Sequence, residues 1–402
     1  MDMSRIRWPE PEPGGPTGRR LQRGPEPKPP EATRVVVAMS GGVDSSVAAA
    51  LLRREGYDVI GITMQLWPSD LPMGHRGESG CCSLSAVEDA RRVAHKLDIP
   101  YYVLNFEKPF TDAVIEPFVE AYLSGLTPNP CLVCNQQVKF GTLLEKALEL
   151  EADYVATGHY VRVGYDPVRG RYVAARSADP SKDQSYTMYG QTQTQLSHTM
   201  CPLGGYRKET IRALALELGL GVALKPDSQE ICFIPDNDYR RFLQQYRPEA
   251  HTPGIMRDVS GKVLGTHRGI AFYTVGQRRG LGLNLGRPYY VVAIDAEANE
   301  VIVGSEDDLK RPGMVVEDVN WVAVESLTEP MDVTVKVRYG AEETPATLEP
   351  GSHPGEVYVR FHEPQKGISP GQAAVFYDED AVVGGGRIAA RKELDVPAPA
   401  HV

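Results

Sequence analysis

The sequence predicts a doubly wound parallel α/β sheet followed by two smaller β units. Over the first half of the chain, apolar runs alternate with helical stretches, which is typical of strands and helices in a parallel sheet. From about His251 to Ile388, short strands and Gly/Pro turns replace that alternation. The 402 residues are enough for two or three domains. We expect an α/β domain over 34–235, a central β unit over 236–308 and a C-terminal β-barrel over 309–392.

Composition limits what the protein can be. The net charge of −10 argues against indiscriminate nucleic-acid binding but leaves room for a local basic surface. No apolar run approaches the roughly 18 residues of a membrane span. Residues 1–33 carry eight prolines and few large apolar groups, so we expect a disordered tail, and residues 393–402 a flexible one. No secretory signal is visible, so we expect a reducing cytoplasm with cysteines as thiols or ligands.

The elements follow in order along the α/β domain. A buried strand is predicted over Val35–Ala38, and a helix from Ser45 to about Arg54. The next helix, over 83–97, should turn one apolar face inward, beginning at Leu84. Further strands are expected over 58–64, 100–106 and 153–157, and further helices over 109–124, 138–150, 207–218 and 238–246.

The turn between the first strand and helix has the form of an anion site. Ser40–Ser46 reads Ser-Gly-Gly-Val-Asp-Ser-Ser, which places unpaired backbone N–H groups and a positive helix end together. A Walker A loop would need a lysine that this loop lacks. The loop instead resembles the pyrophosphate loop of ATP pyrophosphatases, enzymes that cleave ATP between its α and β phosphates. The ligand should lie beyond the carboxyl ends of the strands.

That resemblance implies roles for individual residues. The glycine amides and the hydroxyls of Ser40 and Ser45 would hold phosphate oxygens, and Asp44 would help to position Mg²⁺. Met64 and Gly158 end neighbouring strands and would meet the nucleotide. The predicted ATP-binding residues are Ala38, Met39, Ser40, Gly41, Gly42, Val43, Asp44, Ser45, Met64 and Gly158.

Cysteines form the second group of candidates. Cys131 and Cys134 make a Cys-x-x-Cys pair after Asn129-Pro130, just before a predicted helix, where a thiol is pushed toward thiolate. Cys232 lies far along the chain in Ile-Cys-Phe-Ile. A zinc site, a redox dithiol and a catalytic pair or cluster remain alternatives, although zinc would need a fourth ligand. Cys201 is interpreted as structural. The segment 65–82 is predicted to be a surface loop over the site, and the adjacent Cys81 and Cys82 are interpreted as small, buried apolar residues at a helix start.

A basic and aromatic segment stands out in this acidic chain. Gly261–Tyr290 contains five Lys or Arg residues and no acid. Phe272, Tyr273, Tyr289 and Tyr290 are interleaved with these charges. Basic and aromatic residues together suit contacts to RNA phosphates and bases.

Ordered motifs from Arg34 to Ile388 make the chain similar to the tRNA-specific 2-thiouridylases. These motifs are Ser40–Ser46, Thr127–Asn135 with Lys139–Phe140, Ala156–Tyr160, Lys182–Tyr186, Ile231–Ile234, Gly276–Gly282, Arg338–Tyr339 and Pro370–Gln372. The resemblance implies a pyrophosphate-loop fold of the adenine nucleotide alpha hydrolase type. It also implies that ATP adenylates the C2 oxygen of a wobble uridine in the tRNA anticodon stem-loop. Sulfur from a donor protein then displaces AMP.

By the same resemblance, Cys134 is the nucleophile and Cys232 carries a persulfide. The positions that match the family's tRNA contacts are Asn129, Pro130, Cys131, His159, Lys182, Asp183, Gln184, Arg338, Tyr339 and Gln372. Cys131 stands where some members have aspartate, so Cys131, Cys134 and Cys232 could instead ligate a [4Fe–4S] cluster. Two other functions compete: a pyrophosphate-loop ligase or amidotransferase acting on a small molecule, and a non-catalytic tRNA-binding or iron–sulfur protein.

Overall fold

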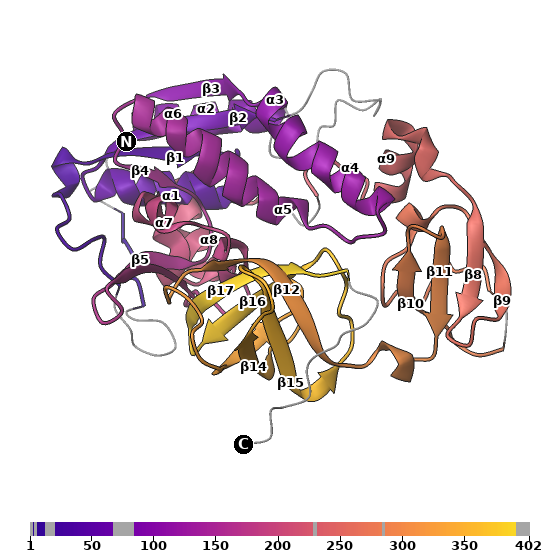
Figure 1. The fold of residues 1–402 in the computed structure, drawn as a ribbon. Coiled ribbons are helices and arrows are strands. Elements are labelled where there is room, and N and C mark those ends of the chain that lie inside the picture. The colour runs from indigo at the N-terminus through magenta and orange to yellow at the C-terminus, as the bar shows by residue number, and fades with distance from the viewer. Residues whose placement is uncertain are drawn as a thin grey trace.

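The computed structural model describes residues 3, 6–12, 21–66, 84–227, 231–283 and 286–390. These residues form a parallel α/β unit, a central β unit and a barrel, arranged as in Figure 1. Most of the predicted surface loop up to Cys82, the cysteine pair within it and the C-terminal tail lie outside the described residues. No described helix is long and apolar enough to cross a membrane.

The α/β unit is built on a parallel sheet in the order β3-β2-β1-β4-β7. Its strands are β1 Arg34–Ala38, β2 Asp58–Gln65, β3 Tyr101–Asn105, β4 Tyr154–Ala156 and β7 Thr199–Met200. Val36 of β1 pairs with both neighbours and is fully buried, as a continuous apolar run in a central strand should be. Strand order reverses between β1 and β4, so the turn after β1 lies at the switch point where such sheets bind ligands.

Helices cover this sheet. Buried residues of α1 Val43–Arg54, α2 Leu84–Leu97 and α8 Lys208–Glu217 share one core cluster with strand residues. The predicted apolar face of α2 is buried from Ala86 onward, but Leu84 is 83% exposed, because it lies at the first residue of the helix. A second cluster holds α3 Glu107–Phe110, a π-helical stretch Thr111–Ile115 and α4 Glu116–Leu123.

The helix expected over 138–150 begins eight residues earlier than predicted. It starts as α5 Pro130–Val133, continues as a π-helical stretch Cys134–Thr142 and ends as α6 Leu143–Glu149. The Asn129 side chain accepts from the Cys131 amide and caps the helix, and Pro130 occupies its first turn. The expectation that the cysteine pair precedes a helix was therefore wrong, since both thiols lie within it.

Several short elements of this unit were not predicted. They are β5 Arg162–Asp166, β6 Arg171–Ala175, α7 Gln193–Ser197 and 3₁₀ turns at Pro30–Ala32, Ser185–Met188 and Pro202–Gly205. The β5–β6 hairpin leaves the parallel sheet and pairs with the barrel through Ala175 and Ala381. An alternating pattern of only five residues per strand is too short to separate such a hairpin from a loop.

The central unit follows helix α9 Tyr239–Tyr246. Its sheet has the order β10-β11-β8-β9. The strands are β8 Gly254–Asp258, β9 Val263–His267, β10 Tyr290–Asp295 and β11 Glu300–Gly304, with 3₁₀ turns at Pro248–Ala250, Ile270–Phe272 and Asp307–Leu309.

The last unit is a closed six-stranded antiparallel barrel. Its strands are β12 Arg311–Trp321, β13 Met331–Lys336, β14 Thr344–Pro350, β15 Val357–Gln365, β16 Ala373–Asp378 and β17 Ala381–Ile388. Pairing of β12 with both β15 and β17 closes it. Closure removes the exposed edges of the sheet. The predicted fold class, a doubly wound sheet followed by a β unit and a barrel, is thus confirmed.

The described parts of the N-terminal segment lie on the α/β unit. The Glu12 amide donates to the Gly205 carbonyl at 2.7 Å, and Gln22 forms a two-way bridge with Tyr165 of β5. The Arg54 guanidinium stacks 4.9 Å from the centre of the Trp8 ring. Residues 6–12 and 21–33 therefore differ from the expected disordered tail, because paired charges and aromatic contacts supplement their small apolar content.

Candidate nucleotide and thiol site

The turn between β1 and α1 places backbone amides at the uncapped N-terminus of α1. Gly41 has φ +68°, and a Cβ there would lie 2.2 Å from the Ala86 carbonyl oxygen, so only glycine fits. Among described residues, no side chain caps the N-terminus of α1, which begins after Gly42. The Ser40 amide donates to Ser45 Oγ at 3.2 Å and keeps the turn tight. These features fit a phosphate group.

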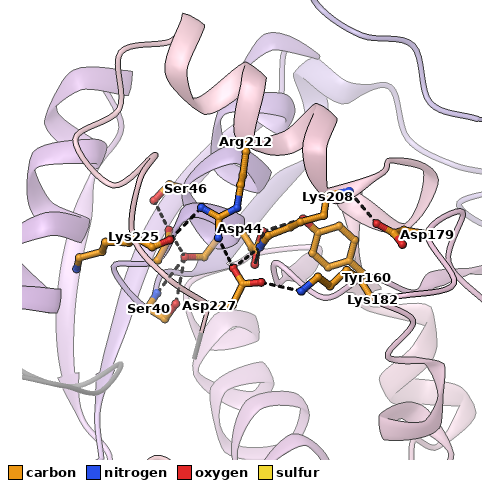
Figure 2. Close-up of polar contacts among 12 residues, drawn as sticks. Ser40, Asp44, Ser46, Tyr160, Asp179, Lys182, Lys208, Arg212, Lys225 and Asp227 are labelled. Carbon is orange, nitrogen blue, oxygen red and sulfur yellow. Dashed lines mark hydrogen bonds and ion pairs between the residues drawn. The ribbon is translucent and has the colours of Figure 1, made fainter. Parts of the chain in front are cut away.

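Asp44, in the first turn of α1, is held by a lysine from α8 (Figure 2). Lys208 Nζ lies 2.7 Å from both carboxylate oxygens of Asp44. The Tyr160 hydroxyl donates to Asp44 Oδ1 at 2.8 Å. Lys208 is 5% exposed and the Asp44 side chain is 30% exposed, so the lysine end of this ion pair is shielded from water.

Asp227 gathers three cations at the same place. Its carboxylate accepts from Lys208 at 2.8 Å, Lys182 at 2.9 Å and Arg212 at 2.7 Å. Burial acts to raise the pKa of Asp227, but the hydrogen bonds from Lys208 and Lys182 outweigh it and lower the pKa to about 2. Asp44 and Asp227 thus hold three cations beside the glycine turn.

Asp179 sets the position of Lys208. Its Oδ2 accepts from the Lys208 amide at 2.9 Å, at the first residue of α8. Burial acts to raise the pKa of Asp179, but hydrogen bonds from Ser181 and Lys208 outweigh it, so the pKa is lowered and the carboxylate stays charged. A charged carboxylate at a helix N-terminus stabilises the helix. Asp179 therefore helps to fix the backbone of Lys208, from which the side chain extends.

The predicted ATP-binding residues lie along one edge of the sheet. Ala38 to Ser45 are continuous, and Met64 and Gly158 lie at the ends of the strands β2 and β4 that flank β1. A Cβ on Gly158 would lie 2.6 Å from the Ser45 amide nitrogen, so glycine is required there for packing against the start of α1. Met64 is 9% exposed and belongs to the core as well as to this edge.

His159 connects this edge to the cysteine helix. Its Nδ1 lies 2.7 Å from Thr157 Oγ1, and its ring is 6.2 Å from that of Phe140, which follows Cys134 in the π-helical stretch. Burial and the nearby Lys139 hold the pKa of His159 well below 6.5, so the imidazole is neutral at pH 7.

Two of the three candidate thiols share one core cluster. Cys134 is 7% exposed and part of the cluster, and Cys232 packs against it. Phe233 and Ile234, each 1% exposed, anchor the chain directly after Cys232. Cys131, in the first turn of α5, is exposed.

The structure does not gather these cysteines into a metal site. Within the described ranges, no group of three or more His, Cys, Asp or Glu side chains is placed to hold a metal ion. Cys131, Cys134 and Cys232 therefore do not fit a [4Fe–4S] cluster in this arrangement. Cys201, interpreted as structural, is within 3.6 Å of Thr157 Oγ1, and burial raises the pKa of its thiol to about 12.

The loop Lys182–Gln184, expected to contact tRNA, makes internal contacts. Lys182 pairs with Asp227, Asp183 accepts from the Ser185 hydroxyl at 2.7 Å, and Gln184 Oε1 accepts from the Tyr160 amide at 2.8 Å. These contacts fix the loop beside the glycine turn.

Of the three barrel positions expected to contact tRNA, two are exposed and one is half-buried against the α/β unit. Arg338 and Tyr339 follow β13 and are exposed. Tyr339 also packs edge-on against Tyr186 at 5.8 Å. Gln372 faces the α/β unit, where its amide donates to the Thr127 carbonyl at 2.9 Å. Asn129 and Pro130 form the cap and first turn of α5.

The basic segment keeps its charges at the surface but not all its rings. The five basic side chains of the segment are all exposed. Phe272 and Tyr273 are 8% and 5% exposed, so these two aromatics are core residues, contrary to the expectation of RNA contact. Tyr289 lies under the Arg287 guanidinium at 4.9 Å. The cations are Lys262, Arg268, Arg278, Arg279 and Arg287.

Reasoning from the sequence missed Tyr160, Lys208, Arg212 and Asp227. Lys208 is 164 residues from Asp44, and no local pattern links the two. The one available signal was Lys225-Pro226-Asp227, which stands just before the Cys232 motif. Lys225 Nζ donates to the Gly41 carbonyl at 3.1 Å.

Comparisons with known proteins agree with this arrangement. Family models match residues 33–236 (tRNA methyl transferase HUP domain), 240–305 (tRNA methyl transferase PRC-barrel domain) and 311–388 (aminomethyltransferase beta-barrel domain). The chain is 54% identical over 368 residues to the tRNA-specific 2-thiouridylase MnmA of Heliobacterium modesticaldum, covering 91% of this chain and 95% of that protein. It is 54% identical to the protein of that name from Moorella thermoacetica, over 88% of this chain and 98% of the relative. The chain belongs to the tRNA-specific 2-thiouridylase family.

Proposed function

We propose that this protein is an ATP-dependent tRNA sulfurtransferase that converts the wobble uridine to 2-thiouridine. The supporting observation is that Gly158 and His159 join two sites: Gly158 packs against the nucleotide turn, and His159 contacts the helix that carries Cys134. Activation of an oxygen by ATP and its displacement by sulfur need such neighbouring sites. A small-molecule ligase would not need the thiols or the basic surface.

The first step uses the charged turn. The amides of α1, the hydroxyls of Ser40 and Ser45 and the ammonium of Lys208 would hold the ATP phosphates. Asp44 would hold Mg²⁺, and the chemistry that the ion supplies there would be neutralisation of phosphate charge. The C2 oxygen of uridine attacks the α phosphate and takes AMP, which converts a poor leaving group into a good one.

The second step uses the thiols. A persulfide on Cys232, loaded by a sulfur-donor protein, attacks C2 with its terminal sulfur, and AMP leaves. The Cys134 thiolate then attacks the Cys232 sulfur, so a Cys134–Cys232 disulfide forms and the terminal sulfur remains on C2. A thiol reductant restores both cysteines. We favour this route over a cluster because the three cysteines are not gathered as ligands.

The tRNA would lie across the exposed cations of the central unit and reach the barrel at Arg338 and Tyr339. Phosphate contacts there would position the anticodon stem-loop, and Tyr339 could stack on a base. A tRNA substrate also implies action in the cytoplasm.

The test is thiolation in a defined mixture. Unmodified substrate tRNA, ATP, Mg²⁺, a sulfur donor and a thiol reductant should yield 2-thiouridine and AMP in equal amounts. Cys134→Ala and Cys232→Ala should each abolish 2-thiouridine formation. Cys201→Ala is the matched control, because its buried, neutral thiol has no role in the steps above, and it should thiolate normally. Absence of thiolated tRNA with a competent donor would refute the proposal.

A further inference from the structure

Lys139 lies in the same π-helical stretch as Cys134, the stretch Cys134–Thr142. Its Nζ donates to Asn135 Oδ1 at 2.9 Å. Asn135 is 2% exposed, so the ammonium group is held by a partner that is itself fixed in the core. The lysine side chain is half-buried, which leaves it accessible to a bound substrate.

His159 connects this ammonium group to the nucleotide edge. Burial and the charge of Lys139 both lower the pKa of His159, so the two side chains are close. The rings of His159 and Phe140 are 6.2 Å apart, which brings the residue after Lys139 to the same histidine. His159 follows Gly158, where a Cβ would lie 2.6 Å from the Ser45 amide nitrogen. Lys139 therefore lies beside the residue that joins the thiol site to the glycine turn.

Of these two neighbours, the lysine is the one that carries charge. The pKa of His159 is well below 6.5, so its imidazole is neutral at pH 7. A neutral imidazole can form hydrogen bonds but cannot neutralise a phosphate. An ammonium group that is fixed and half-buried keeps more of its electrostatic effect than one in bulk water.

The proposed reaction develops negative charge at this junction. The α phosphate of the adenylated uridine joins the nucleotide turn to the base, so the bond that breaks during sulfur transfer lies between the two sites. When sulfur attacks C2, the C2–O bond breaks and its electron pair goes to the oxygen that leaves with AMP. A cation already in place beside that oxygen lowers the barrier, because the charge grows in the transition state.

From this we infer that Lys139 is a catalytic residue that stabilises the AMP leaving group, through contact of its ammonium with the α phosphate of the adenylated uridine. The inference rests on the proposed function for the adenylated intermediate, and it adds the group that promotes the departure of AMP. The two lysines then divide the work: Lys208 serves the phosphates of ATP in the first step, and Lys139 serves the second.

The test separates the charge of Lys139 from its hydrogen bond. Lys139→Gln keeps a donor for Asn135 but removes the charge, whereas Lys139→Arg keeps both. With saturating tRNA and ATP, the thiolation rate should fall about 100-fold in Lys139→Gln and stay within about tenfold of the wild type in Lys139→Arg. AMP attached to tRNA should accumulate in Lys139→Gln, measured with α-labelled ATP. The Kd values for tRNA and for a non-hydrolysable ATP analogue should stay within about twofold of the wild type.

Lys146→Gln is the matched control, because Lys146 lies on the same continuous helix, is about half exposed and pairs with Glu149 at 2.8 Å. It should thiolate at the wild-type rate. A Lys139→Gln variant that thiolates normally would overturn the inference, as would a raised tRNA Kd with an unchanged rate at saturation, or a Lys139→Arg variant as slow as Lys139→Gln.

NMR titration of His159 provides a readout that needs no activity. The pKa of His159 should rise in Lys139→Gln, because a neighbouring cation has been removed. An unchanged pKa would place the lysine charge elsewhere and overturn the inference. A wild type that fails to thiolate tRNA while the His159 pKa responds as expected would refute the proposed function separately.

Discussion

Lys208 supplies the cation that the glycine loop itself lacks. It reaches Asp44 and Asp227 together from the first turn of α8 and is almost fully buried. A Walker A lysine is part of its loop, whereas here the lysine comes from a separate helix. The nucleotide site is therefore a tertiary property of this chain.

Replacing this lysine should therefore affect both binding and stability. Lys208→Met removes a buried ammonium from between two carboxylates, so we expect an ATP Kd raised roughly tenfold or more. The free energy of unfolding should fall by about 1–2 kcal/mol, because Asp44 and Asp227 are partly exposed and Asp227 keeps its pairs with Lys182 and Arg212. Calorimetric ATP titration and urea denaturation measure these effects. Lys96→Met is the control, because Lys96 is only half-buried and bonds the Gly219 carbonyl away from Asp44 and Asp227. Normal ATP affinity in Lys208→Met would contradict the assignment.

Asp227 predicts a pH dependence. Its pKa is about 2 in the folded protein against 3.8 for a free carboxyl, so the folded state favours the charged form. The stabilisation is complete above the unfolded pKa and is lost as the pH falls through about 2. Asp227→Asn should therefore make stability fall less steeply across that acidic range. Denaturation midpoints measured at a series of pH values would show this, and parallel curves for both proteins would contradict it.

At the scale of elements, three aromatic side chains fix the segment after Cys232. The Phe233 ring packs edge-on against Phe110 at 5.7 Å, Phe118 at 5.3 Å and Phe242 at 5.4 Å. These rings belong to α3, α4 and α9. Phe233 therefore anchors the Cys232 segment to two helices that precede it in the sequence and to one that follows it.

Phe233→Ala should destabilise the protein by about 3 kcal/mol, because it opens a cavity among these rings. The same change should raise the alkylation rate of Cys232, since its anchor is lost. Urea denaturation and peptide mass analysis measure the two effects. Phe361→Ala in the barrel core offers a control that should destabilise without altering Cys232. A protected Cys232 in Phe233→Ala would show that the anchor lies elsewhere.

How far the sequence predicted the elements depended on their length and burial. Strand β1 and helix α1 were predicted closely because a continuous apolar run and a glycine turn mark them locally. The start at Pro130 was missed because Asn129 acts as a cap only when its side chain meets the Cys131 amide. The residues around Asp44 were missed for a different reason. They are brought together by packing of α8 against α1, which no periodicity records.

At the scale of the whole molecule, the β5–β6 hairpin joins the α/β unit to the barrel. Arg162 forms an ion pair with Asp380, at side-chain exposures of 10% and 1%. Arg169 pairs with Asp378 at 2.6 Å, and the Arg176 guanidinium lies 4.2 Å from the Tyr377 ring centre. These three arginines therefore bind the hairpin to Tyr377, Asp378 and Asp380 of the barrel.

Breaking the most buried of these pairs should loosen the two units from each other. Arg162→Met leaves Asp380 as a buried, uncompensated charge, which costs about 3 kcal/mol. We expect differential scanning calorimetry to show thermal unfolding split into two transitions, one for each unit. Arg360→Met, which removes a pair with Glu349 inside the barrel, should keep one transition. A single unshifted transition in Arg162→Met would contradict this role of the hairpin.

The separation of Lys208 from Asp44 also has a consequence for how the protein is made. Lys208 is synthesised 164 residues after Asp44, and the barrel strand that pairs with the β5–β6 hairpin comes later still. A nascent chain that ends before α8 carries the loop with Asp44 unneutralised, a poor receptor for a triphosphate. We therefore expect a chain truncated before α8 to bind ATP more weakly than the full chain.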